Sequence, residues 1–87
     1  MNSVTPRIIE ARALNGYYIY LKFQNDEEKV YNMQKCIEEI KYYENLKERE
    51  YFETIKPRGC TVEWKNEEDV CPENLYYESI NYDEFKN

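Results

Sequence analysis

The sequence predicts an α+β fold: an antiparallel sheet of about five short strands with two short helices, in the order β-β-β-α-β-β-α. Two observations predict it. Residues 17–23, YYIYLKF, alternate between two faces directly after Asn15-Gly16, which is a strong hairpin signal. Residues 34–49 change to helical spacing and are rich in Glu and Lys. Strands and helices in this order favour helices packed against one face of an antiparallel sheet.

The remaining strands are predicted from shorter alternating runs. We expect a strand at 7–14, paired with 17–23 through the hairpin, and a third strand at 29–33. Residues 51–56, YFETIK, return to alternation and predict a fourth strand. After a turn at 57–59, CTVEW predicts a fifth strand with Cys60, Val62 and Trp64 on one face.

The predicted helices are short. We expect one helix near 35–41 and a further helical turn near 43–49. The last helix is expected to begin at Pro72, because the missing N–H of proline costs nothing in the first helical turn. Residues 81–87 are expected to be a frayed tail, as chain ends often are.

Length and charge bound what the protein can do. The 87 residues predict a single domain over 1–87, with its core in about 4–80. The chain has 12 basic and 18 acidic residues, a net charge of −6. Direct binding to nucleic acid is not expected, because affinity for phosphates needs a basic surface. An acidic surface keeps a protein soluble and steers it towards basic partners.

No segment of the sequence predicts export or membrane insertion. The start, MNSVTPRIIEARAL, has no apolar run behind a basic end, and no apolar stretch approaches the roughly 20 residues that a membrane helix needs. The three cysteines, at 36, 60 and 71, form no C-x-x-C pair. We therefore expect a cytoplasmic protein with reduced thiols and no membrane partner.

The residue types that catalysis usually needs are missing. The chain has no histidine, which removes the commonest general base, the Ser-His and Cys-His pairs and most zinc sites. Its two glycines cannot build a phosphate-binding loop. Cys71 is the candidate reactive thiol, because a helix N-terminus activates thiols, but no base stands near it in sequence. We expect a protein that is not an enzyme and that uses no cofactor or metal.

The ten tyrosines are the anomaly of the composition, and some are candidate interface anchors. Tyr18 and Tyr20 fall on the non-core face of their strand, next to Lys22. Exposed aromatic residues flanked by charge are typical of interaction surfaces. The alternatives are that a helix covers this face, or that cross-strand aromatic pairs stabilise the sheet. Tyr77 is a further candidate, as the exposed member of the Tyr76-Tyr77 pair.

Acidic runs at 26–28 and 67–69 are the second kind of candidate, with Glu67 and Glu68 as interaction residues. The leading hypothesis is a non-catalytic interaction module that is the acidic partner of a basic protein. The alternative is a decoy, which presents carboxylates as nucleic acid presents phosphates and so blocks a nucleic-acid-binding protein. A homodimer through the tyrosine face or an exposed sheet edge is also predicted as an option.

The end of the chain resembles a known family. Residues 62–76 read V-x-W-x-x-x-x-D-V-x-P-E-x-L-Y, which is similar to the small bacterial family catalogued as domain of unknown function 2442. The resemblance covers about 4–80, and this motif is its specific part. The family usually has Trp-Pro-x-Gly before the Asp, whereas this chain has Trp-Lys-Asn-Glu at 64–67.

The resemblance implies an α+β fold similar to the N-terminal domain of a small nitrifier protein, and no established activity. It also implies an antitoxin-like or regulatory role beside a partner protein. Within the motif it implies structural roles. Trp64 fills the core, Asp69 holds the turn before the helix, Pro72 starts the helix, and Leu75 and Tyr76 pack the helix on the sheet.

Overall fold

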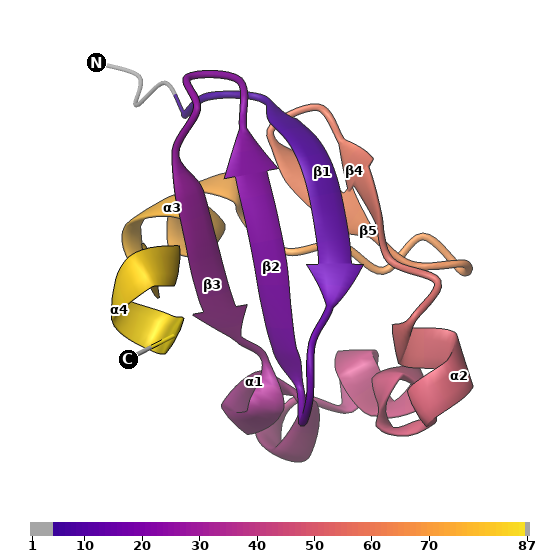
Figure 1. Cartoon of the computed structure of the whole chain (residues 1–87). Coiled ribbons are helices and arrows are strands. Elements are labelled where there is room, and N and C mark those ends of the chain that lie inside the picture. The colour runs from indigo at the N-terminus through magenta and orange to yellow at the C-terminus, as the bar shows by residue number, and fades with distance from the viewer. Residues whose placement is uncertain (1–4, 87) are drawn as a thin grey trace.

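Four antiparallel strands form the main sheet of the computed structural model, which describes residues 5–86 (Figure 1). The predicted boundaries at residues 1, 4 and 87 lie outside the described residues. The sheet has the order β1-β2-β3-β6, and β4 and β5 form a second, two-stranded sheet beside β1. The strands are β1 (Ile8–Ala13), β2 (Tyr18–Phe23), β3 (Glu28–Asn32), β4 (Lys56–Arg58), β5 (Thr61–Glu63) and β6 (Ile80–Asn81).

Short helices lie around the sheets. They are α1 (Gln34–Glu39), the 3-10 helix η1 (Lys41–Lys47), α2 (Arg49–Phe52), α3 (Pro72–Tyr77) and α4 (Tyr82–Lys86). α1, η1 and α2 lie at one end of the main sheet, and α3 and α4 lie beside β3 (Figure 1). The predicted α+β class and its antiparallel sheet are confirmed. No helix within 5–86 has the length and apolar character needed to cross a membrane.

The predicted strand at 51–56 is wrong for most of its length. α2 extends to Phe52, and strand β4 begins only at Lys56. The reason is burial: Phe52 and Ile55 are the buried residues of this segment, and their spacing of three fits a helical turn better than a strand. The expected turn at 57–59 moves as well, because Pro57 lies within β4 and the chain reverses at Gly59, whose φ is +60°.

The frayed tail expected at 81–87 is replaced, over 81–86, by the end of β6 and by helix α4. Two aromatic contacts explain the difference. The ring of Tyr82 lies 5.0 Å from that of Tyr20, and the ring of Phe85 lies 4.9 Å from that of Tyr18. These contacts bury apolar surface that the isolated segment would expose to water.

Trp64 lies at the centre of the core. Its side chain is 1% exposed, and its indole N–H donates a hydrogen bond of 2.9 Å to the carbonyl of Phe52. The Phe52 ring stacks on the indole at 6.0 Å. Val62 and Leu75, on β5 and α3, are also fully buried. The motif at the end of the chain therefore supplies packing between α2, β5 and α3.

Replacing Trp64 by Phe should lower the free energy of unfolding by about 1–3 kcal/mol, because indole volume is lost and the buried Phe52 carbonyl loses its donor. Urea unfolding followed by circular dichroism measures the change. The exposed Lys65→Ala variant is the control and should stay within about 0.5 kcal/mol of the wild type. Iodide that freely quenches Trp64 fluorescence in the folded protein would contradict this account.

Candidate functional site

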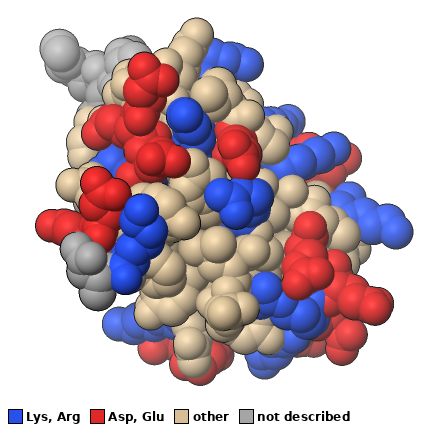
Figure 2. Space-filling view, viewed as in Figure 1, with Lys and Arg blue, Asp and Glu red and all other residues tan. Residues whose placement is uncertain are grey.

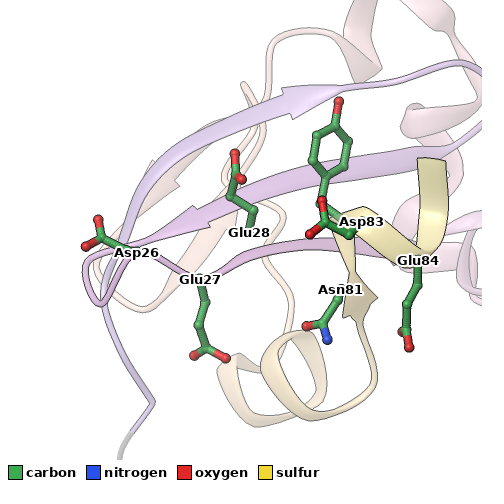
Figure 3. A pocket seen from close by; sticks show the side chains of 7 residues that line it. Asp26, Glu27, Glu28, Asn81, Asp83 and Glu84 are labelled. Atoms are coloured by element: carbon green, nitrogen blue, oxygen red, sulfur yellow. The ribbon is translucent and has the colours of Figure 1, made fainter. Parts of the chain in front are cut away.

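A hollow of about 270 Å³ lies between the β2–β3 turn and the start of α4 (Figure 3). Five of its seven lining residues carry carboxylates. Two segments far apart in the sequence therefore meet here with the same charge. The lining residues are Asp26, Glu27, Glu28, Asn81, Tyr82, Asp83 and Glu84. We call this site the acidic hollow.

The β2–β3 turn positions the first two carboxylates, those of Asp26 and Glu27, and β3 carries that of Glu28. The N–H of Asp26 donates to the carbonyl of Phe23 at 3.0 Å, and Asp26 has a φ of 72°, a left-handed conformation that Asp adopts more readily than most residues. The side chain of Asn25 donates to the Glu27 carboxylate at 2.6 Å and accepts from the Glu27 N–H at 3.1 Å. These local bonds are the Asx pattern that favours tight turns.

The carboxylates surround the paired strands β3 and β6 and do not converge on one point. In Figure 3 the side chains of Glu27, Asn81 and Glu84 extend to one side of β3, and Glu28 extends to the other. The sheet register agrees for Asn81. Asn81 pairs with Lys29 and so shares its face, which is opposite to the face of the preceding residue, Glu28. Among residues 5–86, no group of three or more His, Cys, Asp or Glu side chains is placed to hold a metal ion.

Two tyrosine hydroxyls orient the central carboxylates. Tyr20 donates to Glu28, and Tyr76 donates to Glu27. The hydroxyl of Tyr76 and the amide of Asn25 hold the pKa of Glu27 below its ordinary value, because both donors favour the charged form. Glu27 is therefore a fixed, charged acceptor at neutral pH.

Basic side chains neutralise only part of the negative charge of the acidic hollow. Within the described part of the chain, its carboxylates form one ion pair, between Lys86 Nζ and Asp83 at 3.7 Å. Lys29 lies nearby, with its ammonium 4.9 Å from the centre of the Tyr76 ring. Figure 2 shows acidic side chains gathered over this end of the molecule, with a few basic ones between them.

The tyrosine face is not exposed as the interface hypothesis expects. Tyr20 is only 3% exposed, since the Tyr82 ring covers it and the Arg12 guanidinium lies 4.2 Å from its ring centre. Tyr18 is half-buried under Phe85. The alternative, a helix that covers this face, is the arrangement found. Tyr20 is therefore a packing residue and not an exposed anchor.

The other interaction candidates divide between surface and interior. Tyr77 is 62% exposed at the end of α3, and Glu67 is exposed in a turn with a φ of 71°. Glu68, in contrast, is only 5% exposed and accepts hydrogen bonds from the Tyr51 hydroxyl and from Asn45. Glu68 cannot serve as a surface contact, because the loop turns its side chain inwards.

The predicted structural residues lie as follows. Pro72 is in the first turn of α3, and Tyr76 lies edge-on to Phe23 at 5.1 Å between ring centres. Asp69 acts through its main chain, because its carbonyl accepts a hydrogen bond of 2.7 Å from the Tyr43 hydroxyl. Its exposed carboxylate does not cap the N-terminus of α3. Cys71 is the N-cap of α3, exposed and without a side-chain capping bond.

Asp83 and Glu84 are not among the predicted site residues, because their segment was predicted to be a frayed tail. One signal could have found them. In NYDEFKN the aromatic residues Tyr82 and Phe85 are three positions apart, which places both on one face of a helix. The two acids between them then face away from the sheet and towards solvent.

Comparison with known proteins gives one match. A family model described as a protein of unknown function, DUF2442, matches residues 8–81, which is most of the chain. The match ends just before α4. No curated protein and no solved structure matches. The likeness to the nitrifier protein domain therefore stays a prediction.

Burial, with a smaller contribution from Glu28, raises the pKa of Tyr20 to about 12 from its ordinary value of 10.0. Above pH 10 the unfolded chain releases this proton before the folded chain does, so stability should fall as pH rises from about 10 to about 12. Urea unfolding at pH about 9 and about 11 should show a larger loss for the wild type than for Tyr20→Phe. Tyr77→Phe, at an exposed position, should behave as the wild type; equal losses in all three proteins would refute the assignment.

Proposed function

The chain belongs to the DUF2442 family of proteins of unknown function, and on that premise we propose that it is a non-catalytic interaction module that binds a basic protein partner at the acidic hollow. The observation that carries the proposal is that five carboxylate residues, from the β2–β3 turn, the start of β3 and α4, line one depression. Such a surface complements lysine and arginine side chains and speeds their approach.

The arrangement of the hollow suits a protein segment better than a small molecule. Its carboxylates are spread around two strands, so several basic side chains can each find an acceptor. Glu27 and Glu28 are held by tyrosine hydroxyls, which lowers the entropy cost of forming charge-assisted hydrogen bonds. Ile80, in the strand that supplies Asn81, is 46% exposed and adds an apolar contact beside the charges.

A cellular role follows from this chemistry. An acidic module that covers the basic surface of a small protein would neutralise or regulate it, as an antitoxin-like partner does. A cytoplasmic location is part of the proposal. The three cysteines support it, because all are free thiols in the structure, as expected in a reducing compartment.

The decoy alternative receives less support from the arrangement of charges. A mimic of nucleic acid needs carboxylates in register along one face. The acidic runs at 26–28 and 67–69 lie on opposite sides of the molecule in Figure 1, and Glu68 is buried. A basic protein partner therefore remains the preferred proposal.

The test begins with the partner, recovered by co-purification of the tagged protein from its native host. The double variant Asp83→Asn/Glu84→Gln should weaken the measured affinity about 10-fold, since it removes two of the five charges. The loss should shrink as salt is raised to about 0.5 M. Isothermal titration calorimetry measures both effects.

The matched control is Glu39→Gln/Glu44→Gln, which changes the same charge at exposed positions on α1 and η1. This variant should bind nearly as the wild type does. Equal affinity of the two double variants, or failure to recover any stoichiometric partner, would count against the acidic hollow as the binding site.

A further inference from the structure

Two lysine side chains of the chain itself lie on tyrosine rings at the acidic hollow. The ammonium of Lys29 lies 4.9 Å from the centre of the Tyr76 ring, and that of Lys86 lies 5.0 Å from the centre of the Tyr82 ring. Both distances are within about 6 Å, the range in which the face of an aromatic ring attracts a cation. The same contact therefore occurs twice at one site, once between β3 and α3 and once within α4.

Each of these ammonium groups also lies near a carboxylate of the hollow. Lys86 pairs with Asp83 at 3.7 Å. The pKa of Glu27 is lowered chiefly by the hydroxyl of Tyr76 and to a smaller extent by the positive charge of Lys29, which therefore acts on this carboxylate. The hollow thus contains two places that are built alike. Each consists of a tyrosine ring and a carboxylate, and each holds an ammonium group.

Lys29 lies on the side of β3 to which several polar side chains of the hollow extend. It pairs with Asn81 across β3 and β6, and cross-strand partners share one face of a sheet. The side chain of Asn81 extends to the same side of β3 as those of Glu27 and Glu84 (Figure 3). A basic side chain that approaches this side of the hollow therefore meets an ammonium group that is already in place.

Neither lysine is held in place by deep burial. Lys29 is half-buried, and the side chain of Lys86 is 55% exposed. A lysine ammonium is a compact charge on a flexible four-carbon stem, so it can move into water while the backbone stays in place. The tyrosine ring and the carboxylate that it leaves then offer an incoming ammonium group the same contacts.

We propose that Lys29 and Lys86 are internal competitors, which occupy two ammonium-binding places of the acidic hollow until lysine side chains of the partner displace them. The two tyrosine rings and their neighbouring carboxylates then bind the partner. Because each contact of an internal lysine must be broken first, these lysines set an upper limit on the affinity of the hollow. This inference rests on the proposed function, since it concerns the regulation of that same site.

A short oligolysine peptide is the probe, and an NMR titration measures its dissociation constant and identifies the amides that it perturbs. Lys29→Met/Lys86→Met keeps most of each side chain and removes both ammonium groups. It should bind the peptide about 5-fold more tightly than the wild type, since two cation–ring contacts no longer have to be broken. Lys29→Arg/Lys86→Arg keeps a cation for each ring and should bind as the wild type does.

The matched control is Lys35→Met/Lys65→Met, which removes the same charge at exposed positions on α1 and in the turn after β5. It should tighten binding by less than about 2-fold, because it changes only the long-range field of the protein. Salt at about 0.5 M screens that field. The difference in affinity between the two Met double variants should therefore persist at high salt.

Equal affinity of the two Met double variants for a peptide bound at the hollow would overturn internal competition and leave the proposed function standing. The same conclusion would follow if the Arg double variant gained as much affinity as Lys29→Met/Lys86→Met, because a cation would still be available to each ring. A peptide that perturbs no amide over 26–29 and 80–86 in any of these proteins would overturn both proposals.

Discussion

The buried indole of Trp64 is the contact on which the rest of the fold depends. It stacks on Phe52 and donates to the Phe52 carbonyl, so α2 is joined to the end of β5 by packing and by a hydrogen bond together. The Phe52 ring in turn forms a T-shaped pair with the Tyr17 ring, with 5.1 Å between their centres. Arg49 completes the connection, because its guanidinium donates to the carbonyls of Leu14 and Gly16 in the β1–β2 hairpin.

In this small domain, tyrosine rings supply buried apolar area that a longer chain obtains from a larger core. A short chain buries a smaller share of its surface, and aromatic rings bring large apolar area per residue. Each hydroxyl then fixes a loop, which an aliphatic side chain cannot do. Tyr17 donates to the Lys47 carbonyl and Tyr43 to the Asp69 carbonyl, both at 2.7 Å. Within 5–86 no buried polar side-chain atom lacks a partner.

The same use of tyrosine connects the core to the acidic hollow. The rings of Tyr20 and Tyr76 pack against Tyr82 and Phe23, while their hydroxyls reach the carboxylates of β3 and its turn. A surface of like charges is held in shape by neutral donors, which do not reduce its negative charge. This property suits the basic partner that we propose, since the orientation of Glu27 and Glu28 is set before binding.

The sequence alone determined the features that depend on local pattern. Alternation and the Asn15-Gly16 turn predicted β1, β2 and β3, and Pro72 predicted the start of α3, because hairpin geometry and proline geometry are properties of a few adjacent residues. The burial of Trp64 was predicted for a similar reason. In an alternating strand the large apolar residues share one face, and that face packs on the core.

Only the tertiary structure decided the rest. The segment at 51–56 alternates in sequence, yet the place of Phe52 beside Trp64 makes its start helical, since packing overrides a weak strand preference. The acidic hollow and the cover on Tyr20 depend on where α4 docks, and its docking depends on rings more than fifty positions earlier in the chain. Contacts over such separations leave no periodic signal in a single sequence. The acidic run at 26–28 and a helix over the tyrosine face could be named as candidates, but their meeting with Asp83 and Glu84 could not be predicted.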